Sequence, residues 1–456
     1  KFWGGYDGGS SITWMNSGDP ANGSNGAAHT FDADSGIYMA TTVSSDNSNR
    51  SYVIMNFGQN GTFSNYKTAG GNADGEGIGN FFYSPPSGFK ALCSKNLPTP
   101  TIKKSSEHFD TVTYTGNDSN RNITSYNFQP DFLWLKSLET AYHHRAIDAV
   151  RGSTRSLYVD TNAAELVDDY GTVGGFLSNG FSLRAGAGSN ATHAGTNADG
   201  DDMVAWAWKA NGSGGANTDG ATNSVVSANT TAGFSIVTYS GTGSATTIGH
   251  GLGAVPEVVI VKNRTNNAGN SDAWPMYHKH SFSSGGTAHT SSLYMMNSYA
   301  AYADSDVNWN GTAPTSSVFS LGTWGGVNSS SDTYVAYVFK EIEGFSRFTS
   351  LYGNGSTNGP FIYTGFRPRF AIIKKFQTGD GTSWFLYDSE RFPSNVITTA
   401  IWADVANAET AHAEYYIDFL SNGIKIRGDN AGLNASGKYY IVLAWAESPF
   451  KYANAR

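Results

Sequence analysis

The chain is 456 residues long, which is enough for roughly three or four domains of ordinary size. Only 14% of the residues are charged, 29 Lys and Arg stand against 37 Asp and Glu, and no dense basic stretch occurs, so nucleic-acid binding by phosphate neutralisation is not expected. Cys93 is the single cysteine and no apolar run is long enough to span a bilayer, so an intrachain disulfide, a thiolate zinc site and membrane insertion are not expected either.

The composition favours β structure. Aromatic residues make up 14% of the chain and glycines number 54, a combination typical of short half-buried strands joined by tight turns. Disordered chains are poor in aromatic residues and carry high net charge, and neither holds here. We therefore predict an all-β protein.

Residues 1–98 lack the pattern that recurs in the rest of the chain. They contain NFGQ at 56–59 and PPSGFKALCSKNLP at 85–98, and Pro98-Thr99-Pro100 is typical of a stiff connector. The chain starts at Lys1 rather than Met, so we expect a processed end or an upstream segment.

Three segments of similar pattern follow, at residues 105–210, 232–343 and 344–456, which we call repeats 1, 2 and 3. Each opens with a predicted strand that starts at Phe and ends at Gly, and each continues with a strand that runs from Pro to Lys over six positions. The opening strands are FDTVTYTG (109–116), FSIVTYSG (234–241) and FTSLYG (348–353), and the Pro-to-Lys strands are 130–136, 256–262 and 368–374. We expect the proline to take the first position of its strand, because it cannot donate to a ladder.

Later in each repeat a strand-like element is followed by a closing aromatic strand. In repeats 1 and 3 the element contains Ser-Asn-Gly, which predicts a hairpin turn with positive φ at Asn-Gly. The elements are 176–183, 318–321 and 419–426, and the closing strands are VAWAWK (204–209), VAYVFK (335–340) and VLAWAE (442–447). From the opening Phe to the Ala of the closing strand the spans are 96, 102 and 96 residues (205−109, 336−234, 444−348).

The connections differ between the repeats. Residues 211–231 are rich in Gly, Ser, Asn and Thr and predict a flexible linker or exposed loop between repeats 1 and 2. Repeats 2 and 3 join almost directly through residues 340–347, so we expect these two to pack as a pair. The fold predicted for the whole chain is a partial β-sandwich followed by three tandem β-rich modules of similar fold.

These residues carry a family resemblance. The NFGQ segment and the PPSGFKALCSKNLP ending resemble the later part of the SPRY or concanavalin-like sandwich domains in tail-fibre and other virion proteins of marine phages, of the cyanophage and pelagiphage kind. The three repeats, with the terminus YIVLAWAESPFKYANAR (440–456), resemble the domain of unknown function that follows such a sandwich. The resemblance implies a protein of the virion exterior, on tail or capsid, and brings no reaction with it.

The chemistry that the sequence offers is binding rather than catalysis. An exposed aromatic ring stacks on sugar C–H groups while Asn and Asp bind hydroxyls, and the candidate residues are Trp274, Tyr277, Trp309 and Trp324. Core packing is the competing interpretation for each of them. A polysaccharide depolymerase is a further alternative, because its two carboxylates can lie far apart in sequence.

Two patterns hint at metal ions without predicting one. His278-Lys279-His280 places two imidazoles on one face of a strand, where a threefold axis could gather six nitrogens, but histidines that serve as ordinary hydrogen-bonding groups are the favoured interpretation. Asp306, Asn308, Asn310 and Gly311 match the first half of a calcium loop, yet Ser317 stands where a bidentate Glu is required. We expect no metal, cofactor or catalytic residue.

The expected function is that of a phage appendage, a tail fibre or spike, which attaches to the host surface through glycan contacts. Its expected partners are other virion proteins and copies of itself in a closed homo-oligomer, with a trimer favoured. The alternative is a capsid-decoration or purely structural virion protein without a ligand.

Overall fold

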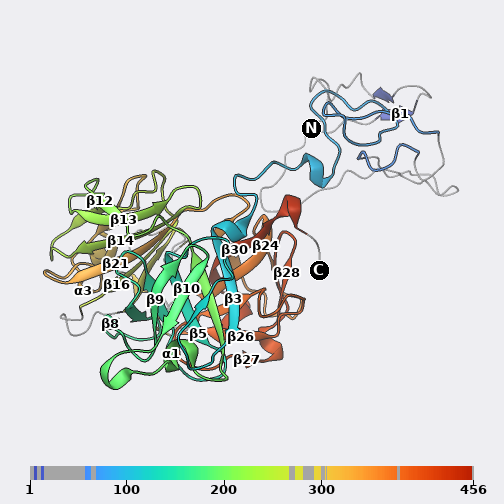
Figure 1. The fold of residues 1–456 in the computed structure, drawn as a ribbon. Coiled ribbons are helices and arrows are strands. Elements are labelled where there is room, and N and C mark those ends of the chain that lie inside the picture. Colours follow the sequence, from blue (N-terminus) through green and yellow to red (C-terminus); the bar gives the residue numbers. More distant parts are fainter. Residues whose placement is uncertain are drawn as a thin grey trace. The chain divides into compact units, whose positions relative to one another are not determined.

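The computed structural model in Figure 1 divides into two compact units, residues 1–99 and 100–456. It describes residues 57–62, 68–265, 273–280, 292–298, 303–304, 306–376 and 381–453, and the backbone of two short strands near the start of the chain. Antiparallel strands dominate the second unit and helices are few and short among the described residues, so the all-β prediction is confirmed. No helix in these ranges has the length and apolar character needed to cross a membrane.

The first unit is described only in part. Strands β1 (Gly5–Asp7) and β2 (Ile12–Trp14) form an antiparallel pair. Asp74 organises the described loops, because its carboxylate accepts hydrogen bonds from the main chain of Ile78 and Ala91 and from the Asn96 side chain. Most of the sandwich predicted for residues 1–98 lies outside the described residues.

Each repeat in the second unit contains one large antiparallel sheet with the same strand order. The opening strand lies at one side, the closing strand comes next, the Pro-to-Lys strand follows, and three further strands complete the order. In repeat 1 the strands are β3 (Phe109–Thr115), β11 (Asp202–Trp208), β5 (Phe132–Ser137), β6 (Arg145–Asp148), β7 (Arg155–Tyr158) and β8 (Leu166–Val167). In repeat 2 they are β14 (Phe234–Ser240), β21 (Thr333–Phe339), β16 (Val258–Asn263), β17 (Pro275–His278), β18 (Ser292–Met295) and β19 (Ala303–Asp304). In repeat 3 they are β22 (Ser346–Tyr352), β30 (Tyr439–Pro449), β24 (Phe366–Lys375), β25 (Phe385–Asp388), β26 (Thr399–Trp402) and β27 (Thr410–Ala411).

A small sheet covers one face of each large sheet. It has three strands in repeats 1 and 3 and two strands in repeat 2. In sheet order these are β4 (Arg121–Ile123), β10 (Gly180–Arg184) and β9 (Thr172–Leu177); β15 (Thr246–Gly249) and β20 (Val318–Leu321); and β23 (Phe361–Tyr363), β29 (Gly423–Ile426) and β28 (Ile417–Leu420). The helices are single turns, α1 (Ala194–Asn197), α2 (Asp306–Trp309), α3 (Gly325–Asn328) and α4 (Ala431–Asn434).

The strand registers correct two details of the predicted repeat. In the strand pairing, the residue of repeat 3 that corresponds to Phe109 is Ser346 rather than Phe348. The residue of repeat 3 that corresponds to Val204 in the closing strand is Ile441 rather than Val442. Proline does not start its strand either. Pro368 lies inside β24, where the register shifts on both sides of it because proline has no N–H to donate to the ladder.

The Ser-Asn-Gly hairpins are confirmed, but their glycines act differently from the prediction. Leu177 pairs with Gly180 and Leu420 pairs with Gly423, so each turn consists of Ser and Asn, and neither glycine has a positive φ. A Cβ on Gly180 would lie 1.8 Å from the carbonyl oxygen of Ile123 in the neighbouring strand. The glycine is required by this close approach of two strands.

The linker predicted at residues 211–231 is instead part of a sheet. Strands β12 (Gly215–Asn217) and β13 (Ser224–Asn229) extend the large sheet of repeat 2 beyond β14. Thr222 also bridges to Ile248 of β15, so the segment covers one edge of the small sheet. The sequence did not predict these strands because the segment is rich in small polar residues, although Val226 and Ala228 of β13 pack against the core of repeat 2.

The three large sheets pack around one shared core. Trp208, Phe339 and Trp445 occupy the matching position of the three closing strands, each paired with the residue two positions after the proline of the Pro-to-Lys strand. Their ring centroids lie 6.4, 5.3 and 5.4 Å apart, so each ring touches the other two. The repeats therefore surround a pseudo-threefold axis. Repeats 2 and 3 contact each other, and repeat 1 packs against both of them.

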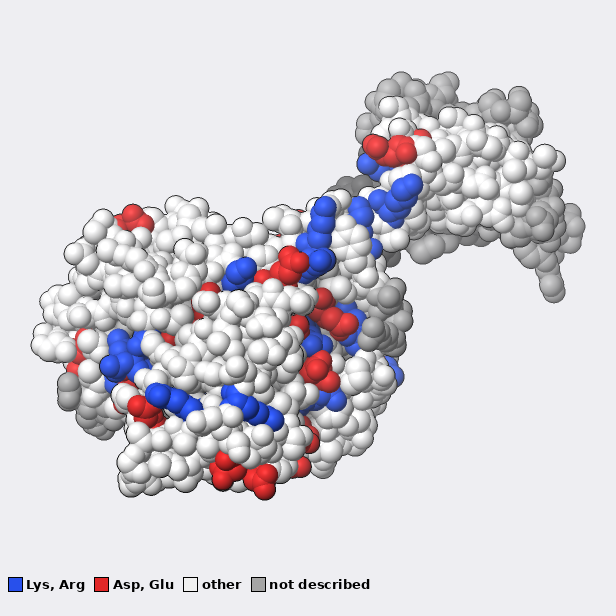
Figure 2. Space-filling model, in the orientation of Figure 1, with Lys and Arg blue, Asp and Glu red and all other residues white. Residues whose placement is uncertain are grey.

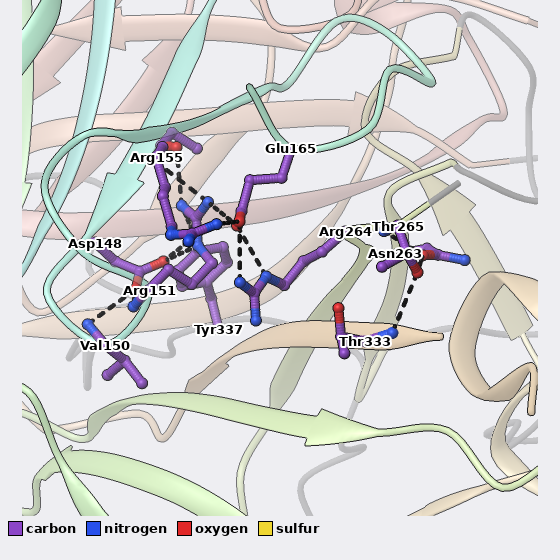
Figure 3. Close-up of polar contacts among 11 residues, drawn as sticks. Asp148, Val150, Arg151, Arg155, Glu165, Asn263, Arg264, Thr265, Thr333 and Tyr337 are labelled. Atoms are coloured by element: carbon purple, nitrogen blue, oxygen red, sulfur yellow. Dashed lines mark hydrogen bonds and ion pairs between the residues drawn. The ribbon is translucent and has the colours of Figure 1, made fainter. Parts of the chain in front are cut away.

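Buried polar contacts link the repeats in cyclic order. The Tyr337 hydroxyl of repeat 2 donates to Asp148 of repeat 1 over 2.7 Å, and the matching Trp206 of repeat 1 donates its indole N–H to Asp388 of repeat 3 over 3.3 Å. Figure 3 shows the first of these junctions, where Glu165 of repeat 1 also binds Arg264 of repeat 2 at 2.8 Å. The third junction differs, because Leu443 of repeat 3 stands at the position of Trp206 and Tyr337 and has no polar group to donate.

Candidate functional site

The residues proposed for sugar stacking turn out to be core residues. Trp274 and Trp309 are each 2% exposed and Tyr277 is 8% exposed, so none offers a ring face to a ligand. Trp274 donates its indole N–H to the main chain of Tyr158, a contact between repeats 1 and 2. Trp324 is half-buried against the core of repeat 2. The prediction is wrong for Trp274, Tyr277 and Trp309, because neighbouring elements cover these rings.

The two sequence patterns considered for metal binding also contain buried residues that belong to the interior. His278 is fully buried, its Nδ1 accepts a hydrogen bond from the main chain of His280, and burial lowers the pKa of its imidazole well below the usual value. Asn308 of the calcium-like segment is 1% exposed. Across the described residues, no group of three or more His, Cys, Asp or Glu side chains could hold a metal ion.

The lysines that end the Pro-to-Lys strands are buried as well. Lys136, Lys262 and Lys374 are each 0% exposed, and burial lowers the pKa of Lys136 and Lys374 to about 8. The ammonium group of Lys136 donates to the carbonyls of Ser137 and Thr140, and that of Lys374 lies 5.4 Å from the centre of the Trp384 ring. These cations hold loops and aromatic rings of the interior, so they offer no surface site.

One residue that recurs in all three repeats was not predicted from the sequence. Asn197, Asn328 and Asn434 end the helical turns α1, α3 and α4, and all are fully buried. Each side chain binds the loop that follows the opening strand; Asn434, for example, accepts from the main chain of Asn354 and donates to the Ser356 carbonyl. The sequence pattern that could have revealed these asparagines is Gly-x-Asn. Its Asn lies seven residues before Val204, Val335 and Ile441, which occupy the same position in the three closing strands (204−197, 335−328, 441−434).

Positions that differ between repeats are better candidates for function, because the fold does not require their side chains. The inner faces of the small sheets keep apolar residues, such as Ile123 in β4 and Ile362 in β23. The outer faces diverge, and Asn122 in repeat 1 corresponds to Phe361 in repeat 3 by register. The small sheets of repeats 1 and 3 therefore present different chemistry to solvent on the same framework.

The outer face of the small sheet in repeat 3 carries two exposed aromatic rings. Phe361 is 46% and Tyr363 58% exposed, and the alternation of β23 puts them on the same side while Ile362 is buried. Phe361 lies over Gly423, because a Cβ there would come within 2.6 Å of the ring. We call Phe361, Tyr363 and Gly423 the aromatic face.

Polar groups border the aromatic face. Lys425 is paired by register with Phe361 on one side and with Asp418 on the other. Its ammonium group donates to the Asn358 side chain over 2.8 Å. Asp418 in turn binds the half-exposed Arg427 at 3.2 Å. Aromatic rings beside amide and carboxylate groups form the combination expected of a sugar-binding surface.

Residues 104–449 match a family described as a domain of unknown function, DUF7483. The chain belongs to this family. The match runs from the start of repeat 1 to the end of repeat 3, so the family's unit is the ring of three repeats rather than a single repeat. No curated protein and no solved structure matches the chain.

Proposed function

We propose that the three-repeat unit is a binding protein for carbohydrate, and that the aromatic face is a contact surface for neutral sugar rings. The observation that carries this proposal is the exposure of Phe361 and Tyr363 on one side of β23, whereas the rings of the interior are covered. Two side chains two positions apart on a strand lie roughly 7 Å apart, so they can contact neighbouring parts of one oligosaccharide.

The polar border supports the same proposal. The exposed Asn358 supplies an amide group for sugar hydroxyls, and Lys425 holds it in place. Gly423 leaves room beside the Phe361 ring, since no side chain rises from the neighbouring strand there. A surface of this kind would suit attachment to a host glycan, and a position on the exterior of a virion remains part of the proposal.

The test is binding of the full-length chain to immobilised neutral polysaccharides, with dextran, mannan, galactan and pullulan as probes. We expect Phe361→Ala and Tyr363→Ala each to weaken binding about tenfold, equivalent to about 1.4 kcal/mol. Tyr352→Ala is the matched control, because Tyr352 is 54% exposed and belongs to β22 of the large sheet rather than to the small sheet. Unchanged binding by a Phe361→Ala, Tyr363→Ala double variant would sink the proposal.

The competing function is that of a structural virion protein without a ligand. It predicts that the wild-type chain binds none of the four polysaccharides at high concentration. A depolymerase would instead shorten the polysaccharide with time, which gel filtration of the probe after incubation would detect.

A further inference from the structure

The small sheet of repeat 1 has a hollow on its outer face, over strands β4, β10 and β9. The hollow has a volume of about 400 Å³, within the range of small-molecule sites. Its lining includes Asn120, Asn122, Gly174, Ser182 and Arg184, and no aromatic ring among the described residues lines it. We call these five residues the polar hollow.

The hollow is present because one row of the sheet carries small residues. Across the paired strands of repeat 1 this row consists of Asn122, Ser182 and Gly175. The residues at the same places in repeat 3 are all larger: Phe361, Lys425 and Asp418. The same framework is therefore filled in repeat 3 and hollow in repeat 1, so the fold does not require the small row.

A β-bulge lowers the floor of the hollow. Opposite the neighbouring residues Ser182 and Leu183 of β10, strand β9 carries an extra residue, Gly174, which has no partner in the ladder. A Cβ on Gly174 would lie 2.9 Å from the Ser182 hydroxyl and 3.3 Å from Cδ of Arg184. Because Gly174 has no side chain, both of these groups lie low against the backbone. A ligand can therefore approach the main chain of the sheet here.

Two exposed side-chain amides stand along one side of the hollow, on β4 and just before it. The Oδ1 atom of Asn120 accepts hydrogen bonds from the main chain of Ala185 over 3.2 Å and from Nε2 of His193 over 3.0 Å. These contacts orient the amide, and its NH2 group makes no hydrogen bond to a described residue. The side chain of Asn122 is exposed and makes none either, so its carbonyl and NH2 groups are both open to a ligand.

The polar hollow is neutral as a whole. Arg184 donates through Nη2 to Asp168 over 2.7 Å, so its charge is offset. Arg121 alternates with Asn122, and its guanidinium group donates to the Thr115 carbonyl of β3, away from the outer face. Figure 2 shows this side of the repeat unit as mostly uncharged, with Lys and Arg in small separate groups. A charged ligand would find no unpaired partner in the hollow, so a neutral one is favoured.

Hydrogen-bond donors outnumber acceptors in the polar hollow. Asn120 contributes its NH2 group, and Arg184 contributes Nη1, which makes no hydrogen bond within the described part of the chain. The acceptors are the side-chain carbonyl of Asn122 and the hydroxyl of Ser182, which itself donates to the Gly175 carbonyl. A carbonyl oxygen of a ligand accepts without having to donate, whereas a hydroxyl group does both. A ligand that carries a carbonyl group therefore suits the hollow better than one with hydroxyl groups alone.

We propose that the polar hollow binds the acetamido group of an N-acetylated amino sugar, such as an N-acetylhexosamine unit of a polysaccharide. The C=O and N–H of this neutral group point in opposite directions, because its amide is trans. Side chains two positions apart on a strand lie roughly 7 Å apart, a span that a trans amide bridges with one hydrogen bond at each end. The ligand carbonyl accepts from Asn120, and the ligand N–H donates to the carbonyl of Asn122. The inference rests on the proposed carbohydrate binding but concerns a second site and another class of sugar.

The test is isothermal titration of the full-length chain with triacetylchitotriose and with cellotriose, which has the same linkage but a hydroxyl in place of each acetamido group. We expect triacetylchitotriose to bind about tenfold more tightly than cellotriose. Asn122→Ala should weaken its binding about fivefold, because one hydrogen bond is lost. Ser182→Met should abolish binding, since a longer side chain fills the hollow, and the framework accepts one at this place in repeat 3, where Lys425 stands.

Asn211→Ala is the matched control. Asn211 is an exposed asparagine of the segment 211–231, and its side chain makes no hydrogen bond to a described residue. This variant should bind triacetylchitotriose as the wild type does. Thermal unfolding of each variant checks that the fold is intact. The Phe361→Ala, Tyr363→Ala double variant should keep the preference for triacetylchitotriose, because the aromatic face is a different site.

The inference fails if the chain does not bind triacetylchitotriose or binds both trisaccharides equally, if Ser182→Met binds as the wild type does, or if Asn122→Ala loses no more affinity than Asn211→Ala. It also fails if the double variant loses the preference, since the acetamido contact would then belong to the aromatic face. The two sites fail separately, because the polysaccharides that test the aromatic face carry no acetamido groups.

Discussion

Replacing Glu165 by Gln should destabilise the junction between repeats 1 and 2. The carboxylate of Glu165 binds Arg151 at 3.1 Å, Arg155 at 2.7 Å and Arg264 at 2.8 Å, and its own side chain is only 7% exposed. Figure 3 shows these arginines converging on it from both repeats. Glutamine keeps the shape of the side chain but removes the charge that the arginines share.

The pKa of Glu165 sets the size of the effect. Burial alone would raise this pKa, but the hydrogen bond from Arg264 and the charges of Arg151 and Arg264 outweigh it and lower the pKa from 4.5 to about 2. At about 1.4 kcal/mol per pKa unit, the ionised carboxylate stabilises the folded chain by about 3 kcal/mol. Arg155 is 43% exposed, so solvent screening makes this an upper figure.

The pH dependence gives the prediction a second test. A lowered folded-state pKa means that the contribution is complete above pH 4.5 and is lost as the pH falls towards 2. Glu165→Gln should therefore unfold at lower denaturant concentration than the wild type at pH 7, and the difference should shrink at pH 3. Urea titrations followed by tryptophan fluorescence would measure both.

Glu107→Gln is the control, because Glu107 is 50% exposed and pairs only with the exposed Lys104. We expect this variant to differ from the wild type by less than about 0.5 kcal/mol. If Glu165→Gln were as stable as Glu107→Gln at pH 7, or if its deficit were as large at pH 3 as at pH 7, the carboxylate would not be what stabilises this junction.

Two further predictions concern the interior. Gly180→Ala should lower the free energy of unfolding by about 1–3 kcal/mol, because its Cβ would overlap the Ile123 carbonyl. Gly215→Ala is the control and should be nearly neutral, since no atom lies within 4 Å of its Cβ position. Equal thermal stability of the two variants would refute the role of close strand approach. Burial of Lys374 lowers its pKa from 10.5 to about 8. Between pH 8 and pH 10.5 the unfolded chain therefore binds one proton more than the folded chain. The free energy of unfolding of the wild type should rise with pH in that window, by about 3 kcal/mol at most. Lys374→Met should flatten the rise between pH 7.5 and 9.5 in urea titrations, and parallel curves for the two proteins would contradict this.

The repeats were readable from the sequence because strand pairing imposes local patterns. The opening strand, the Pro-to-Lys strand and the closing strand predicted for each repeat are all present, and the structure shows them as neighbours in one large sheet. Turn residues were readable for the same reason, and the hairpins at Asn179 and Asn422 are present. Their glycines were misread because the contact that requires them comes from a third strand.

The tertiary structure decided which aromatic rings are available. In the closing strands both faces are buried, since one face meets the small sheet of the same repeat and the other meets the shared core. Trp274 and Tyr363 therefore look alike as aromatic residues in a polar chain, although the first is covered by repeat 1 and the second is 58% exposed.

The sequence by itself determined the strands, the three repeats and the all-β class, because these depend on neighbours along the chain and on alternation with period two. Only the tertiary structure decided that the repeats close into a ring around Trp208, Phe339 and Trp445, that residues 211–231 form strands, and that the outer faces of the small sheets differ in chemistry. The ring depends on contacts between residues more than a hundred positions apart, and the other two properties depend on which strands pair and which face is covered, none of which the local pattern encodes.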